Sequence, residues 1–171
     1  MRSTFEKLCL VGVAALFLSA TSAHAGLRVE FDEGAPKDRF RIKNTGSCPI
    51  TNSSVLVDLS TSRGGLIFDV TVRGEGVEVF QPFEVESGGS SLAGQPIVRD
   101  GQTDIELDIS SLGPQSEIVF TIDVDDTRGT RAITVSGAEI EGATVRYRRG
   151  QSTASAAFTA RSTAVLSATN C

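Results

Sequence analysis

Apolar and polar residues alternate with a period of two along most of this chain. The pattern is visible in segments 27–32, 39–43, 55–59 and 104–109, and it is clearest in segment 117–125. Alternation of this kind is typical of β-strands that bury one face, whereas amphipathic helices repeat every 3.6 residues. Since hardly any segment follows the helical period, the sequence predicts an all-β protein.

Residues that favour turns separate the alternating segments. The stretch Asn44-Thr45-Gly46-Ser47-Cys48-Pro49 is predicted to be a hairpin connection, in which the Asn-x-Gly cluster supplies positive φ angles. Gly64-Gly65 precedes a short apolar run at 66–68, which suits a strand covered on both sides. Pro82 has no backbone N–H, so segment 83–86 is not expected to be a central strand.

The C-terminal third is less regular. Glu141-Gly142 is predicted to be a hairpin loop between strands at 138–140 and 143–147. Segment 150–155 is interpreted as a polar linker, and segment 156–168 as one or two strands. In total, about eight to ten short strands predict a single antiparallel β-sandwich of the immunoglobulin-like or fibronectin-like class.

The N-terminus has the pattern of a secretory signal peptide. Residues 1–25 combine a charged start, an apolar run at 8–19 and an Ala23-His24-Ala25 cleavage motif. The apolar run is shorter than the roughly 20 residues that a bilayer core requires, so we expect no transmembrane anchor. Cleavage would leave residues 26–171 as the β-sandwich domain, located in the periplasm, at the cell surface or in the medium.

Composition excludes several classes of function. The full sequence has a net charge of −5 and one histidine, His24, which lies in the signal peptide. The mature chain therefore lacks the histidine of Ser-His-Asp and Cys-His catalytic groups and of histidine-based zinc sites. Acidic charge also disfavours nucleic acid as a partner, because phosphate binding needs a basic patch. Arg146, Arg148 and Arg149 form a basic cluster, which we interpret as a solvated strand edge.

Two of the three cysteines remain after cleavage, because Cys9 leaves with the signal peptide. Cys48 and Cys171 are an even pair in an exported protein, which favours a disulfide bond. The bridge would tie the C-terminus to the turn at 44–49. Two free thiols are the alternative, and a catalytic thiol is not expected without a histidine to activate it.

An acidic cluster ends the clearest predicted strand. Alternation places Asp123 and Asp125 on the same outward face, and Asp126 follows them. Carboxylates at a strand end suit calcium, which prefers oxygen ligands. Aspartate is also common in turns because of its own geometry, so a solvated turn is the alternative that we favour. No cofactor other than calcium is expected.

Carboxylates alone would serve a glycoside hydrolase, which needs two acids across a cleft. Asp104, Glu106 and Asp108 line one face of a predicted strand, but any exposed strand shows this pattern. The chain has no tryptophan and one tyrosine, Tyr147, so aromatic rings for stacking on sugars are scarce. We therefore expect no enzymatic activity.

Four segments carry a family resemblance. They are FRIKNTGSC at 40–48, GGLIFD at 64–69, GVEVFQPF at 76–83 and FTIDVDDT at 120–127. Through them the chain resembles exported bacterial proteins labelled aggregation factor core protein, an alphaproteobacterial group named by analogy with the sponge adhesion proteoglycan. The resemblance implies surface adhesion with a calcium requirement, for which Asp123, Asp125 and Asp126 would be the candidate ligands.

These observations predict a non-catalytic role outside the cytoplasm. The leading prediction is a secreted or periplasmic β-sandwich that acts as an adhesion or extracellular matrix component, with an extracellular protein or glycan as its partner. The alternative is an accessory module that binds a carbohydrate, or that binds a partner protein by strand-edge pairing. A small glycan hydrolase that uses carboxylates is the third hypothesis.

Overall fold

The computed structural model describes residues 25–168 except 75, 77–79 and 129–134, so most of the predicted signal peptide lies outside it. Within this part of the chain, one helical element is present, the 3-10 turn η1 (Gly89–Ser91). No helix found there is long and apolar enough to cross a membrane. The described strands are β1 (Ala25–Asp32), β2 (Asp38–Asn44), β3 (Ile50–Asp58), β4 (Ile67–Asp69), β5 (Glu84–Ser87), β6 (Asp104–Leu112), β7 (Glu117–Asp125), β8 (Thr144–Arg149), β9 (Ser152–Ala157) and β10 (Thr163–Ala168).

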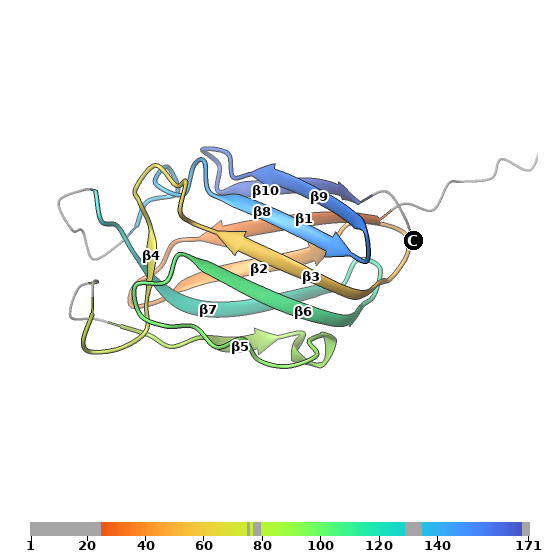
Figure 1. Ribbon diagram of the computed structural model, residues 1–171, viewed down its shortest axis with the longest axis horizontal. Coiled ribbons are helices and arrows are strands. Elements are labelled where there is room, and N and C mark those ends of the chain that lie inside the picture. Colours follow the sequence, from red (N-terminus) through yellow and green to blue (C-terminus); the bar gives the residue numbers. More distant parts are fainter. Residues whose placement is uncertain (1–24, 75, 77–79, 129–134, 169–171) are drawn as a thin grey trace, which may run out of the picture.

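The strands form two antiparallel sheets that are stacked on each other (Figure 1). The larger sheet has the order β10-β1-β2-β7-β4, with β5 also paired to β7, and the smaller sheet has the order β6-β3-β8-β9. The neighbours β1-β2-β7 and β3-β8-β9 match the A-B-E and C-F-G orders of an immunoglobulin domain. The predicted antiparallel β-sandwich is therefore confirmed.

The core is built from the alternate residues of both sheets. On β6, Ile105, Leu107 and Ile109 are buried while the residues between them are exposed. In the larger sheet, the ring of Phe40 packs against that of Phe120, with the ring centroids 5.2 Å apart. Phenylalanine rings bury a large apolar area, so this pair anchors β2 to β7 and fixes the face that each strand turns inward.

The connection after β2 is not the predicted hairpin, because β2 lies in the larger sheet and β3 in the smaller one. Neither Asn44 nor Gly46 has a positive φ angle. The buried Asn44 side chain organises the turn instead, since its Oδ1 accepts a hydrogen bond of 2.9 Å from the N–H of Gly46. Its Nδ2 donates to the carbonyl groups of Cys48, Leu112 and Gly113 at 2.8, 3.0 and 3.1 Å.

Two predictions for the C-terminal third are wrong. Residues 138–140 form a turn before β8, in which the N–H of Glu139 donates to the carbonyl of Ser136 at 2.8 Å. Residues 152–155 belong to β9, which pairs with β8 along its whole length. Their side chains are small and give a weak alternation, so pairing with the neighbouring strand decides their structure.

Candidate functional site

The outer face of the smaller sheet carries polar side chains in rows across the strands. Strand register makes Asp108 of β6, Ser54 of β3 and Arg148 of β8 direct neighbours. This face is acidic along β6 and basic along β8, because alternate residues of each strand point to the same side. The next row repeats the order of acid, central residue and arginine: Glu106, Leu56 and Arg146.

One ion pair crosses this face diagonally. Nη2 of Arg148 lies 3.2 Å from Oε1 of Glu106. The two side chains remain 60% and 46% exposed, so the pair contributes only about 0–1 kcal/mol to folding stability. Because the fold depends so little on this pair, its charged groups are available to a ligand.

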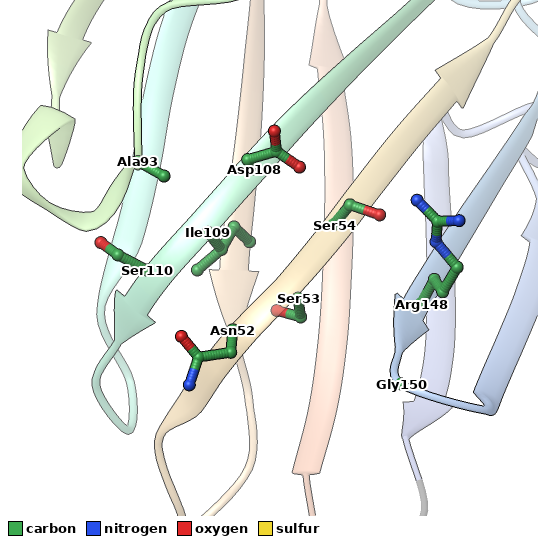
Figure 2. A pocket seen from close by; sticks show the side chains of 9 residues that line it. All are labelled: Asn52, Ser53, Ser54, Ala93, Asp108, Ile109, Ser110, Arg148 and Gly150. Carbon is green, nitrogen blue, oxygen red and sulfur yellow. The ribbon is translucent and has the colours of Figure 1, made fainter.

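A shallow groove of about 490 Å³ lies on the same face. Figure 2 shows Asp108, Ser54 and Arg148 on three neighbouring strands, with Asn52 and Ser110 toward one end. Asn52 has a φ of 46°, a left-handed conformation that asparagine tolerates. The register between β3 and β6 skips Asn52 and Ser110. The remaining lining residues are Ser53, Ala93, Ile109 and Gly150.

Two smaller depressions continue the groove across the sheet. The first, of about 210 Å³, shares Ser54 and Arg148 with the groove and also contains Arg146. The second, of about 350 Å³, joins Arg146 to Thr153 and Ser155 of β9. The three depressions adjoin one another through shared lining residues and are open to solvent, whereas small-molecule sites are concave and bury most of their ligand. The arrangement therefore suits an extended ligand that lies across the strands.

The groups along this path are hydrogen-bond donors and acceptors. Carboxylates accept, guanidinium groups donate, and serine, threonine and asparagine side chains do both. Tyr147, the single tyrosine, lies on β8 but points into the core and is 3% exposed. Apolar residues such as Leu56, Ala93 and Ile109 lie between these polar groups. Among the described residues, none at this site provides an aromatic platform.

The sequence analysis identified parts of this site but not the site itself. Asp104, Glu106 and Asp108 do line the exposed face of their strand, as predicted. Arg146 and Arg148 of the arginine cluster are exposed, as predicted, but they do not lie on an edge strand, because β8 lies between β3 and β9. Ser54 was not predicted as a site residue. The sequence does not show that its strand lies between an acidic and a basic strand, so Ser54 looks like any serine on the outer face of a strand.

The second candidate site is the acidic cluster on β7. Asp123, Asp125 and Asp126 are only 5%, 3% and 5% exposed, so the favoured prediction of a solvated turn is wrong. Asp123 and Asp125 do share the face of β7 that points away from the core, because Val124 between them is part of the core. The burial has a tertiary cause, since β4 pairs with this end of β7.

Asp69 of β4 joins this cluster, although the sequence analysis did not include it. Its cross-strand partner is Asp123, so the two side chains lie on the same face. Burial raises the pKa of Asp69 to about 7, and a side-chain hydrogen bond with Asp100 and repulsion from Asp100, Asp125 and Asp123 act in the same direction. Burial also raises the pKa of Asp123 to about 7, followed by repulsion from Asp125 and Asp38. The sequence signal that could have pointed to Asp69 is its position at the end of the predicted strand segment 66–69.

The structure describes only one cysteine of the predicted disulfide bond, Cys48, because Cys171 lies outside the described residues. Cys48 is buried in the turn that Asn44 organises. The last described strand, β10, pairs its Ala168 with Ala25, and the carbonyl of the adjacent Gly26 accepts a 2.9 Å hydrogen bond from the N–H of Thr45. The described chain thus ends close to the turn that carries Cys48, and the Cys48–Cys171 pairing stays a prediction.

Replacing Cys48 with alanine is expected to loosen the C-terminus before the rest of the sandwich. The predicted bridge would hold β10 to the turn, whereas the central strands have their own pairing and core. Limited proteolysis followed by mass spectrometry should show earlier cleavage after β10 in the variant. The unreduced wild-type chain should be two hydrogens lighter than the reduced chain, and equal masses would refute the bridge.

Comparison with known proteins gives one distant likeness in shape. No family model matches the sequence, and no curated protein matches it. One solved structure has a similar fold, and the alignment covers 86% of this chain and 98% of the other chain. That structure shows biomass-sensing modules from putative Rsgi-like proteins of Clostridium thermocellum, and it is described as resembling a family 3 carbohydrate-binding module of the cellulosome. The identity is 12% and the TM-score 0.33, so the comparison assigns no residue a role.

Proposed function

We propose that this protein is an exported, non-catalytic module that binds a polysaccharide along the outer face of β6-β3-β8-β9. The observation that carries the proposal is the row of adjoining depressions whose polar lining includes Asp108, Ser54, Arg148 and Arg146. A polysaccharide presents many hydroxyl groups along an extended chain, so it matches both the open shape and the mixed donors and acceptors of this path.

Binding of this kind suits a role in adhesion or in an extracellular matrix. A sandwich that recognises a polymer by one face would attach cells to that polymer without altering it. The predicted signal peptide and the resemblance to aggregation factor core proteins support the same role. The first test is therefore for a glycan ligand, and the second is for a role in cell adhesion.

Replacing Arg148 with alanine is expected to weaken glycan binding about 10- to 100-fold. A hydrogen bond to a charged group contributes about 1.5–3 kcal/mol, and each 1.4 kcal/mol corresponds to tenfold in the dissociation constant. The mature chain would first be screened on an array of neutral and acidic oligosaccharides and by sedimentation with insoluble polysaccharides. Dissociation constants of the wild type, Arg148→Ala and Asp108→Ala would then be compared by calorimetry.

Arg63→Ala is the matched control, because Arg63 forms an exposed ion pair of 3.1 Å with Glu141 and does not line the groove. Its affinity should stay within twofold of the wild type. The proposal fails if no glycan binds the mature chain, or if the groove variants bind as tightly as the control. For the adhesion role, cells that lack the gene should clump less, and normal clumping would contradict it.

A further inference from the structure

One side of the sandwich leaves two strand edges open. β9 ends the smaller sheet and β10 ends the larger sheet, and the two strands lie next to each other (Figure 1). Neither strand contains a proline or a charged residue, and each keeps a continuous register with its neighbour. Edge strands are usually protected by such residues or by bulges, because an open edge pairs readily with another chain. This side of the sandwich is therefore able to accept a further strand.

The strand edges on the opposite side are protected. At β4, the N–H of Phe68 donates to the carbonyl of Gln102 at 2.9 Å, so a loop segment covers that edge. At β6, the N–H of Ala93 donates to the carbonyl of Asp108 at 2.8 Å. β5 is short, carries two glutamates and has an irregular register with β7. The contrast identifies the side formed by β9 and β10 as the place where another chain can pair.

The outer edge of β10 presents unpaired backbone groups. The carbonyl of Ser162, just before β10, accepts a 2.9 Å hydrogen bond from the N–H of Phe31, so Ser162 turns its backbone groups toward β1. Because these groups alternate in direction along a strand, those of Val165 and Ser167 point away from β1. Among the described residues, none forms a backbone hydrogen bond with them. A strand added beside β10 would supply the missing partners.

A groove of about 630 Å³ lies at this edge. It is lined by Thr163 and Val165 of β10, by Ala156 and Ala157 of β9, and by the turn 159–161 that joins the two strands. The side chain of Val165 is 57% exposed, whereas its neighbours in β10 are part of the core. The groove thus offers an apolar surface to alternate side chains of an added strand.

Two arginines also line the groove. Arg28 of β1 is the cross-strand partner of Val165, so the two side chains share the outer face of the larger sheet. Arg28 lies 3.4 Å from Glu30, but both side chains are partly exposed, and such pairs are weak. Arg161 is exposed and forms no ion pair with a described carboxylate. Both arginines are available to acidic residues of a bound strand.

A second copy of this chain does not match these charges. β10 has no carboxylate, so a second β10 would bring two more arginines to the groove and no acid. The acidic strand at the other side, β5, already uses Glu84 and Glu86 in ion pairs of 2.6 and 2.7 Å with Lys37 and Arg39. The occupant that fits is therefore a strand of another protein.

We propose that β10 binds an extended segment of a partner protein in which apolar residues alternate with acidic residues. The segment adds one strand to the larger sheet and pairs with the backbone of Val165 and Ser167. Its apolar side chains fill the groove, and its carboxylates contact Arg28 and Arg161. The sequence analysis named strand-edge pairing without an edge or a partner chemistry, and both come from the structure.

The test measures binding of synthetic peptides of about ten residues, the length of a long strand, to the mature chain. One fluorescently labelled peptide alternates valine with glutamate, and a second alternates valine with lysine. Fluorescence anisotropy should show that the valine-glutamate peptide binds at least tenfold more tightly. Arg28→Ala and Arg161→Ala should each weaken its binding about two- to fivefold, as expected for exposed ion pairs. Arg63→Ala should leave the affinity unchanged.

Val165→Pro is expected to weaken binding of the valine-glutamate peptide at least tenfold. Proline removes the N–H that faces the added strand and leaves the hydrogen bonds between β10 and β1 in place. Val165→Asp is a second variant at the same exposed position, and its charge should repel the acidic peptide. Ser155→Pro is the matched control, because the N–H of Ser155 also faces an open edge, that of β9. It should bind the peptide as the wild type does.

Several results would overturn the proposal. They are no binding of the valine-glutamate peptide, equal affinity for the two peptides, or wild-type affinity in both Val165 variants. Loss of binding in Ser155→Pro alone would move the site to β9. Sedimentation velocity of the chain without peptide should show a monomer, and a dimer that Val165→Pro dissociates would make a second copy the occupant.

Peptide binding and glycan binding are tested separately, because the glycan is proposed to lie on the outer face of the smaller sheet. Arg148→Ala should bind the valine-glutamate peptide as the wild type does. A chain that binds this peptide but no glycan would support the β10 site and refute the proposed function, and the opposite pattern would do the reverse.

Discussion

Replacing Asn44 with alanine is expected to lower the free energy of unfolding by about 2–4 kcal/mol. The Asn44 side chain is fully buried, and its Nδ2 donates to the carbonyl of Cys48 in its own turn and to those of Leu112 and Gly113 at the end of β6. Alanine would leave those carbonyls and the N–H of Gly46 without this partner, and a buried unsatisfied polar group costs about 1–3 kcal/mol. Urea denaturation monitored by circular dichroism would measure the change.

Asn44→Asp is the isosteric variant that separates hydrogen bonding from packing. Aspartate keeps the shape and the bond from Gly46 but has no donor, so it should destabilise at least as strongly as alanine at neutral pH. Gln115→Asn serves as the control, because Gln115 is exposed and donates at 3.2 Å to the carbonyls of Thr45 and Gly46. It should change stability by less than about 0.5 kcal/mol, and equal losses in all three variants would contradict the role of Asn44.

In the presence of chelator, the protein is expected to lose stability as the pH rises from 5 to 8. Burial raises the pKa of Asp38 to about 7, against the opposing hydrogen bonds from the N–H groups of Gly34 and Val124. Asp69 and Asp123 are raised to about 7 in the same way. A carboxyl with a raised pKa holds its proton more tightly in the folded state, so its stabilising effect is complete below about pH 4 and is lost as the pH passes 7.

The measurement is the free energy of unfolding in urea at pH 5, 6, 7 and 8. Each such carboxyl contributes a slope of up to about 1.4 kcal/mol per pH unit inside this window. Asp38→Asn should reduce the slope, whatever it does to absolute stability, because an amide does not titrate. A stability that is constant or rises across this range would contradict the prediction.

Alternation predicted which residues share a face within a strand. It identified the buried residues of β6 and the core-facing residues of β7, and it placed Asp123 and Asp125 together, because the period of two is a property of the extended backbone itself. It did not predict that the other face of β7 is buried as well. Alternation does not reveal what lies over a face. Whether Asp123 is solvated or buried depends on the pairing of β4 with β7, which brings together residues more than fifty positions apart in the sequence.

Turn chemistry predicted where the chain changes direction but not where it goes next. Asn44 and Gly46 do mark a turn, yet the turn links two sheets rather than two paired strands. A hairpin and a crossing between sheets use the same residue types, because both need local backbone hydrogen bonds to be satisfied. The distant partners of Asn44, the carbonyls of Leu112 and Gly113, decide between them.

The sequence by itself determined the class of this protein, because its alternation makes it an antiparallel β-sandwich. It also shows that the single histidine, at position 24, lies within the predicted signal peptide. Only the tertiary structure decided which side chains meet. Asp108, Ser54 and Arg148 form one row, and Asp69 joins Asp123 and Asp125, because strand pairing is set by packing between distant segments. Local patterns carry little information about that pairing, since strands of the two sheets, such as β2 and β6, alternate with the same period.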